Sequence, residues 1–261
     1  GGVLLPLLVR QVGAPAVTCL VRATSDTRQL RALGVQAHVC DLARPATYRD
    51  VLGPETTYIG IVAVKTPCFP DTLAMLQARG VRRAVFLSST LVFSHYTQHG
   101  DAFRANEARI RRSGITYTIL RASMIYGSTP GKNSIQQLLR ALNRWPVYPL
   151  FGSGDNLMQP VHAEDLSRGI LAALASPRAE NAEFNLAGSA PLPYRVLVQT
   201  AAQALARRVL ILPISLAAAT GMVKVLQRLP GFPLNERHLL RLREDKAFDI
   251  APAAAALAYA P

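Results

Sequence analysis

The segment FLSSTLVFSHYTQHG, residues 86–100, contains side chains that could transfer protons. Ser88 and Ser89 end an apolar run typical of a buried strand, and Tyr96 follows soon after. A serine hydroxyl can orient a substrate oxygen, and a phenol can donate or accept a proton. A lysine four residues after the phenol would share its helix face, but Gly100 stands there and the chain has no Tyr-x-x-x-Lys. The segment therefore indicates either proton transfer with a substitute acid or a ligand-binding fold without this chemistry.

Composition favours a globular protein with anionic partners. Half of the 261 residues are hydrophobic and 17% are charged, whereas the formal net charge is +13. A basic surface attracts nucleotides, sugar phosphates, nucleic acid or acidic lipid; the alternative is an arginine-rich genome. Basic residues are scattered and form no run with interleaved aromatics, so nucleic acid is not a predicted partner.

Cysteines and apolar runs indicate a reducing compartment and no membrane span. Cys19, Cys40 and Cys68 lack metal-type spacing, so we predict no metal site and expect free thiols. The longest apolar run, residues 209–223, is shorter than the roughly 20 residues that a bilayer span needs. The chain opens without a basic segment before an apolar one, so no signal peptide is predicted. We expect a cytoplasmic protein without a transmembrane segment.

Strand-like and helix-like segments alternate over the first half of the chain. The predicted strands are 16–22, 35–42, 57–64, 81–89 and 115–123. The predicted helices between them are 27–34, 46–53, 71–80 and 101–113. Because parallel neighbours need helical crossovers, this rhythm predicts an α/β fold with a doubly wound, Rossmann-like parallel sheet.

The rhythm changes near residue 128, where STPGKNS and FGSGDN are loop-forming and later segments are mostly helical. We therefore predict a core over 1–127, a small, mainly helical C-terminal substrate lobe from 128–155 and 187–261, and a return to the core over 156–186. Such a lobe would close over the strand ends, where ligands bind in open α/β sheets.

The first segment, GGVLLPLLVRQVG, looks like the helix that normally follows a first strand and glycine-rich turn. We expect that strand and most of the turn to lie upstream of residue 1. Gly1 would then be the last glycine of the turn, where a missing side chain permits close helix–sheet packing beside a pyrophosphate. The alternative is that Gly1 and Gly2 are a cloning remnant.

Five segments in order resemble one family. They are FLSSTLVF, GITYTILRASMIYG, QPVHAEDLSRGILAAL, FNLAGSAPLPYRVL and NERHLLRLREDKAFDIAPAAAALAYAP. Together they resemble the extended and atypical short-chain dehydrogenase/reductases, related to NAD-dependent nucleotide-sugar epimerases and dehydratases. The resemblance spans nearly the whole chain and implies a dinucleotide cofactor.

The resemblance implies cofactor contacts at the ends of the strands. Asp41 and Leu42 stand where the family uses Asp-Leu to bind the adenine amino group; helix capping is the alternative for Asp41. Arg22 replaces an acid that holds the ribose 2′-hydroxyl, so NADP is preferred over NAD, unless Arg22 is merely solvated. The full predicted cofactor set is Gly1, Arg22, Asp41, Leu42, Ala63, Ser88 and Arg121.

The family couples hydride transfer to a tyrosine, with a lysine four residues later and an orienting Ser or Thr. Ser89 matches the hydroxyl position, but neither the tyrosine near 99–100 nor the lysine near 103–104 is present. His95, Tyr96 or Tyr126 could be the substitute acid, with Arg104 supplying the lysine's charge. The alternatives are dinucleotide binding without catalysis, or chemistry that needs no tyrosine because water protonates the acceptor of the hydride. The predicted catalytic set is Ser89, Tyr96, Arg104 and Tyr126.

On the substrate side, the resemblance places Lys132, Asn133, Gln159 and His162 near the ligand. An exposed loop lysine and a structural histidine at a helix entry are the alternatives for Lys132 and His162. Asp165 is expected in the first turn of that helix, where negative charge suits the dipole.

We predict an NADP- or NAD-binding protein that oxidises, reduces or epimerises a nucleotide-linked sugar or related carbonyl compound. Its expected partners are a small, anionic substrate and, as a possibility, a second copy in a homodimer. The competing hypothesis is a non-catalytic dinucleotide sensor or scaffold that stabilises a complex. A third, weaker hypothesis is peripheral contact with a membrane or lipid-linked substrate through 205–245, which core helices would also explain.

Overall fold

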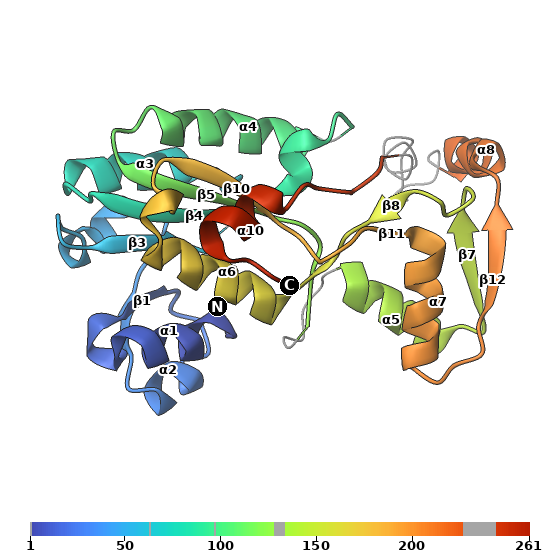
Figure 1. Cartoon of the computed structure of the whole chain (residues 1–261), viewed down its shortest axis with the longest axis horizontal. Coiled ribbons are helices and arrows are strands. Elements are labelled where there is room, and N and C mark those ends of the chain that lie inside the picture. Colours follow the sequence, from blue (N-terminus) through green and yellow to red (C-terminus); the bar gives the residue numbers. More distant parts are fainter. Residues whose placement is uncertain (1, 63, 97, 128–133, 227–243) are drawn as a thin grey trace.

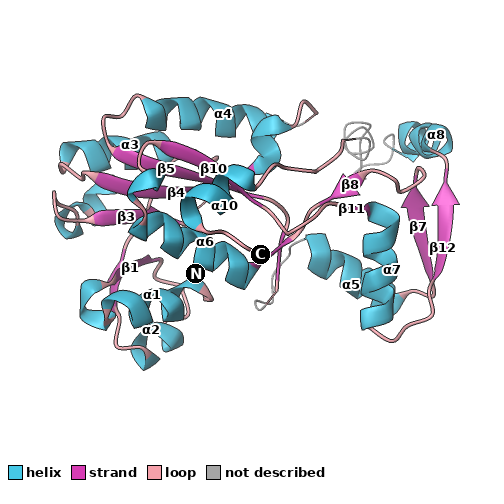
Figure 2. Cartoon of the chain, viewed as in Figure 1, coloured by secondary structure: helices cyan, strands magenta, loops and turns pink. Residues whose placement is uncertain are grey.

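An α/β core and a separate lobe make up the chain (Figures 1 and 2). The structure is a computed structural model that describes residues 2–62, 64–96, 98–127, 134–226 and 244–261. The core strands are β1 (Thr18–Val21), β2 (Gln36–Val39), β3 (Thr57–Gly60), β4 (Arg83–Ser89), β5 (Thr116–Ala122) and β10 (Ala182–Leu186). The core helices are α1 (Leu4–Val12), α2 (Arg28–Ala32), α3 (Phe69–Ala78), α4 (Gln98–Arg111), α6 (Ala163–Ala175) and α10 (Ala251–Leu257).

The central sheet is parallel and has the order β10-β5-β4-β3. Helices α3 and α4 lie on one face, and α1, α6 and α10 lie on the other (Figure 1). Alternation along β4 explains this layering, because Ala84 and Phe86 join the apolar cluster under α3 and α4, whereas Val85 joins the cluster under α6. The predicted α/β fold with a doubly wound parallel sheet is confirmed.

Strands β1 and β2 form a separate parallel pair. Among the described residues, no backbone hydrogen bond joins this pair to β3. The apolar cluster of Leu5, Val17, Leu30 and Val35 lies between α1, α2 and this pair, and it is distinct from the two clusters of the main sheet. The sheet is thus divided into two parts in this chain.

Two sequence predictions in the core need correction. The expected helix over 46–53 is a pair of 3₁₀ turns, Pro45–Thr47 and Arg49–Val51. The Thr47 hydroxyl donates to the carbonyls of Asp41 and Arg44, at 3.1 and 2.8 Å, and such local bonds compete with a longer helix. The strand expected over 57–64 ends at Gly60, because its ladder with β4 ends there.

The lobe contains α5 (Ser134–Arg144), α7 (Tyr194–Ala204) and α8 (Leu216–Leu226). It also contains a parallel strand pair, β7 (Val147–Phe151) and β12 (Leu210–Ile214), and an antiparallel pair, β8 (Leu157–Met158) and β11 (Leu192–Pro193). A last parallel pair, β6 (Ile125–Tyr126) and β9 (Val161–His162), lies where the chain passes between core and lobe. The lobe is therefore less purely helical than predicted, and the predicted domain boundaries stay a prediction.

Candidate functional site

Polar side chains meet at the carboxyl ends of β4 and β5. Ser88 lies opposite Arg121 in the parallel register, and Ser89 lies opposite Ala122. Glu107 of α4 is only 1% exposed, and it accepts a 2.6 Å hydrogen bond from the Ser88 hydroxyl. This end of the sheet is therefore linked to α4 through a buried carboxylate.

Glu107 belongs to an ion-pair network that is buried at Glu107 and partly exposed at Arg111. Arg121 Nη2 lies 2.6 Å from Glu107 Oε2 and also pairs with Glu183 of β10. Arg111 bridges the same two carboxylates, at 3.3 Å from Glu107 and 2.5 Å from Glu183. Burial alone would lower the pKa of Arg121, but the hydrogen bonds and charges of the two glutamates outweigh it and raise that pKa. The network holds α4, β5 and β10 in register.

Arg121 also lies with its guanidinium carbon 5.3 Å from the ring centroid of Phe93, in the loop after β4. Both Ser88 and Arg121 thus have protein partners at the strand ends. Their predicted contacts with a cofactor stay predictions.

The loop after β4 carries Ser89 and Tyr96. Ser89 accepts a 3.2 Å hydrogen bond from the backbone N–H of Leu91, which leaves its hydroxyl hydrogen to donate elsewhere. The Tyr96 side chain is exposed at 39%. The two residues therefore come from one short segment at the carboxyl edge, as the sequence predicted, whereas their catalytic roles are untested.

Arg104 fastens this loop to the start of α4. Its Nη1 donates to the carbonyls of Val92 and Ser94, at 2.5 and 3.2 Å, and its Nη2 pairs with Asp101 at 2.6 Å. The charge that could replace a catalytic lysine is thus partly neutralised by a neighbouring carboxylate. Arg104 is placed to hold the loop, and its role toward a ligand stays a prediction.

Tyr126 and His162 pack edge to face, with ring centroids 5.2 Å apart. His162 is the N-cap of α6, and its Nδ1 accepts from the backbone N–H of Glu164 at 3.4 Å. Gly127 has φ +96°, a backbone conformation that residues with a side chain rarely adopt, and a Cβ there would lie 2.2 Å from His162 Nε2. The histidine lies at a helix entry, as its structural alternative proposed, and Asp165 lies in the first turn as predicted.

Gln159 is 3% exposed and both ends of its amide are engaged. Its Oε1 accepts from the backbone N–H of Phe248 at 2.7 Å, and its Nε2 donates to the carbonyl of Gly188 at 2.7 Å. The Ser123 hydroxyl donates to the Gln159 carbonyl at 2.6 Å. Gln159 therefore links the segments that carry Ser123, Gly188 and Phe248 by hydrogen bonds. Its predicted contact with a substrate stays a prediction.

The other half of the carboxyl edge is more open. Arg22, directly after β1, is exposed and forms no ion pair with the described residues. Asp41, after β2, accepts from the backbone N–H of Ala43 at 3.0 Å, whereas the 3₁₀ turn that follows has Arg44 as its N-cap, without a side-chain bond. Ile61 and Val62 follow β3 and are exposed at 42% and 43%.

Leu42 packs partly buried against the cluster under α3 and α4. Four predicted site residues, Gly1, Ala63, Lys132 and Asn133, lie outside the described residues. Within the described ranges, no group of His, Cys, Asp and Glu is arranged to hold a metal ion.

Sequence reasoning missed Glu107 and Glu244. Glu107 lies on a helix face with Phe103 and Ile110, four residues before and three after it, and both are buried. The sequence signal that could have identified Glu107 as buried is its position on one helix face with two apolar residues. Glu244 accepts from the Ser94 hydroxyl and the His95 backbone N–H, at 2.9 and 3.0 Å, and no local pattern indicates this long-range contact.

Comparison with known proteins supports the predicted resemblance. Residues 71–187 match the model of the NAD dependent epimerase/dehydratase family. None of the curated proteins matches the chain in sequence.

Solved structures show the same fold at low sequence identity. The UDP-glucose 4-epimerase of Thermotoga maritima with UDP-glucose is 15% identical, with a TM-score of 0.73, and the match covers 100% of this chain and 90% of that one. The NADPH-dependent quinone oxidoreductase of Escherichia coli complexed with NADPH is 17% identical, with a TM-score of 0.76 and coverages of 100% and 92%. The triphenylmethane reductase of a Citrobacter species complexed with NADP(H) is 16% identical, with a TM-score of 0.75 and coverages of 100% and 92%.

Proposed function

Since the chain carries an NAD-dependent epimerase/dehydratase family match over residues 71–187 on a Rossmann-like sheet, we propose that it binds NADP or NAD at the carboxyl edge of that sheet. We further propose that it uses this cofactor to oxidise, reduce or epimerise a nucleotide-linked sugar or a related carbonyl compound. The observation that carries the proposal is the open half of this edge, formed by Arg22, Asp41, Ile61 and Val62.

The residues at this edge fit an adenine dinucleotide. Ile61 and Val62 expose apolar side chains directly after a strand of a parallel sheet, where an adenine ring could cover them. Arg22 is an exposed guanidinium after the neighbouring strand pair, which suits a ribose 2′-phosphate. This arrangement favours NADP over NAD.

The divided sheet leaves a position for one more parallel strand between β1 and β3. Strand β3 is an edge of the main sheet and β1 is paired only with β2 among the described residues, so each has an unpaired side. A parallel strand between them would satisfy both sides and would deliver a glycine-rich turn to the start of α1.

Ser89 and Tyr96 would act on the substrate. A bound nicotinamide would supply or accept the hydride. Ser89 would donate its free hydroxyl hydrogen to a substrate oxygen, and the exposed Tyr96 phenol would exchange a proton with that oxygen. Arg104 would hold the loop that carries both residues, because its guanidinium is bonded to two carbonyls of that loop.

A non-catalytic dinucleotide sensor or scaffold is the second candidate. The same Arg104 contacts favour it, since a guanidinium bonded to Asp101 and two carbonyls is poorly suited to the lysine's part in proton transfer. In that case cofactor binding would persist without turnover.

Binding is tested by titrating NADPH and NADH and following nicotinamide fluorescence, with the natural chain including any residues before Gly1. Arg22→Ala should weaken NADPH about tenfold and leave NADH unchanged, because only NADPH carries the 2′-phosphate. Arg31→Ala, an exposed arginine on α2, is the matched control and should change neither. If neither dinucleotide binds, the proposed cofactor is wrong, and if NADPH affinity is unchanged, the Arg22 assignment is wrong.

Catalysis is tested by turnover with a panel of nucleotide sugars and simple carbonyl compounds. Ser89→Ala and Tyr96→Phe should each lower kcat at least a hundredfold while NADPH binding is retained. Binding without turnover on any substrate would favour the sensor.

A further inference from the structure

The strand pair β7–β12 in the lobe has one covered face. Leu150 of β7 is buried and Ile211 of β12 is partly buried, and both pack against α5 and α7 through Leu142 and Val198. The pair lies at the end of the molecule farthest from β1 and β2 (Figure 1). Its inner face is therefore part of the lobe core.

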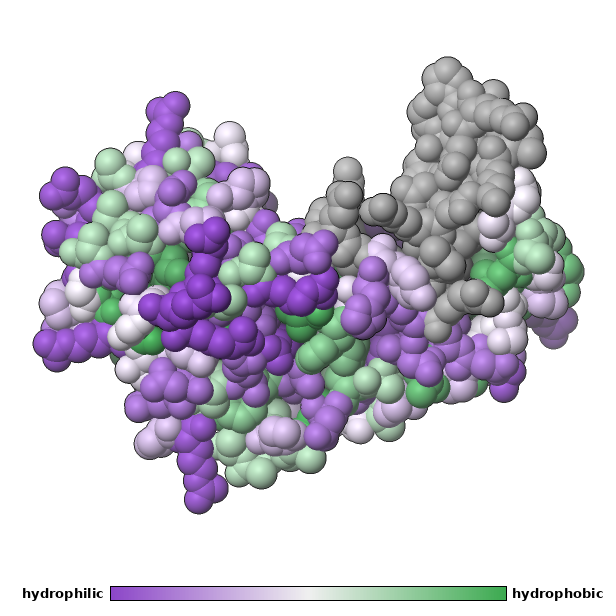
Figure 3. Space-filling view, turned by 90° about the horizontal axis from the view of Figure 1, so that it is seen from above, coloured by the Kyte–Doolittle hydropathy of each residue, from purple (hydrophilic) through white to green (hydrophobic). Residues whose placement is uncertain are grey.

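The opposite face is apolar and exposed. Leu210 pairs with Val147 and Leu212 pairs with Pro149 in the parallel register, so all four side chains share one face. Leu210 is 63% exposed, Leu212 49% and Val147 41%. Apolar surface gathers at this end of the lobe in Figure 3. Such a contiguous patch on a globular protein marks an interaction site.

A tryptophan and three arginines border this face. Trp145, just before β7, is 58% exposed, and the guanidinium of Arg144 lies 5.3 Å from its ring centroid. Arg207 and Arg208 precede β12 and are exposed. Segments 134–154 and 196–226, which build the strand pair and its helices, contain no aspartate or glutamate. The charged side chains of these two segments are therefore all basic.

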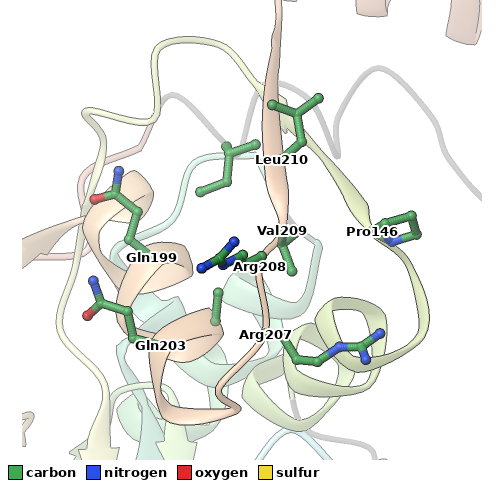
Figure 4. Close-up of a pocket in the computed structure, with 9 residues that line it drawn as sticks. Pro146, Gln199, Gln203, Arg207, Arg208, Val209 and Leu210 are labelled. Atoms are coloured by element: carbon green, nitrogen blue, oxygen red, sulfur yellow. The ribbon is translucent and has the colours of Figure 1, made fainter.

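A hollow of about 530 Å³ opens beside this face. Gln199 and Gln203 line it from α7, where they lie one turn apart, and Arg208 lies between them and the strand (Figure 4). Leu210 lines the same hollow and also belongs to the exposed face. Guanidinium and amide N–H groups are donors that suit a phosphate, with apolar surface directly adjacent.

We propose that this face docks on a membrane that contains anionic phospholipid, with a phosphate headgroup in the hollow and the exposed apolar side chains in the interface. Among the described residues, no helix is long and apolar enough to cross a membrane, so the contact is peripheral. Exposed tryptophan and leucine side chains insert into the interface of a bilayer, and the neighbouring arginines attract anionic headgroups.

A second copy of the chain fits this face less well. In a two-fold dimer the same patch meets itself, so the basic border of one copy would approach the basic border of the other. Without carboxylates in these segments, the charges would repel. Phospholipid supplies both the negative charge and the apolar surface.

The test is co-sedimentation of the chain with vesicles of phosphatidylcholine alone and of phosphatidylcholine mixed with phosphatidylglycerol. Binding is expected only to the mixed vesicles. Arg208→Gln should weaken it about fivefold, the effect of one basic residue near an anionic surface. Arg109→Gln removes the same charge from exposed α4, at the other end of the molecule, and should have no effect. The double variant Leu210→Ser, Leu212→Ser should weaken binding at least as much as Arg208→Gln, with an unchanged circular dichroism spectrum.

The proposal is overturned if mixed vesicles do not bind, or if Arg109→Gln weakens binding as much as Arg208→Gln, because attraction would then follow net charge alone. Displacement from vesicles by millimolar glycerol phosphate would instead identify a site for a free anion. Light scattering on the same samples gives the oligomeric state. A dimer that the leucine variants dissociate, with vesicle binding unchanged, would make the face an interface between copies and refute membrane docking.

Discussion

Replacing Glu107 by glutamine tests whether the buried network holds the carboxyl edge together. Glutamine keeps the shape and can still accept from the Ser88 hydroxyl, but it removes the charge that faces Arg121 at 2.6 Å. The Glu107 side chain is 2% exposed and that of Arg121 is 14% exposed, so solvent compensates little. Removing one partner of a buried pair costs about 3–5 kcal/mol. Arg121 retains Glu183, so we expect the lower end, about 3 kcal/mol.

For a chain of this size, each kcal/mol lowers Tm by about 2–4 °C, so Glu107→Gln should lower it by about 6–12 °C. Thermal unfolding followed by circular dichroism measures this shift. The matched control is Glu164→Gln, which also breaks a glutamate–arginine pair, at 2.7 Å, but with the Glu164 side chain 44% exposed and that of Arg168 64% exposed. Exposed pairs contribute about 0–1 kcal/mol, so the control should move Tm by no more than about 4 °C. Equal shifts in the two variants would refute the reasoning.

Three further outcomes are expected. In a urea titration, Gly127→Ala should lower the unfolding free energy by about 1–3 kcal/mol from its φ of +96° alone, and the added Cβ would also collide with His162. The control Gly53→Ala has nothing within 4 Å of a Cβ and should leave the unfolding free energy nearly unchanged. Burial raises the pKa of Glu183, but its arginine partners outweigh burial and lower that pKa below its ordinary value. The stabilisation by ionised Glu183 is therefore present above about pH 4.3, the ordinary pKa of an unfolded glutamate, and is lost as pH falls through the folded pKa. Glu183→Gln should flatten the fall of Tm between pH 5 and pH 3 relative to the native chain. An unchanged slope would contradict this. Gln159→Ala should lower the unfolding free energy by about 2 kcal/mol or more, because it leaves the Phe248 N–H and the Gly188 carbonyl without partners. Unchanged stability with weakened substrate binding would instead place this amide at the ligand.

The core strands could be predicted from sequence because their signals are local. In β4, Ala84 and Phe86 alternate with Val85 between two helical faces, and glycines such as Gly34 and Gly80 end the preceding helices with positive φ. The strand pair of the lobe was missed for an equally local reason. Pro149 and Pro213 interrupt β7 and β12, and proline argues against a central strand, whereas an isolated pair accepts it.

The site could be predicted only in part, since its partners are distant in sequence. Ser89 ends a strand and Tyr96 follows it closely, so their position at the carboxyl edge of the sheet could be predicted from the sequence. The contact of Ser94 with Glu244 depends on how the C-terminal segment returns across the loop after β4, where Phe93 and Phe248 also stack at 5.9 Å. No periodicity encodes such a return.

Burial divides the polar groups of the carboxyl edge into two classes. Ser88 donates its hydroxyl hydrogen to Glu107, and Arg121 pairs with the same carboxylate, so these donors join β4, β5 and α4. Ser89 and Tyr96, a few residues away, keep hydroxyl groups that the described contacts leave partly unused. A ligand gains most from donors that have no strong protein partner, because displacing a charged bond from a buried network costs more than a new bond returns. We therefore propose that proton transfer at this edge passes through Ser89 and Tyr96, while Arg104 holds the loop that carries them.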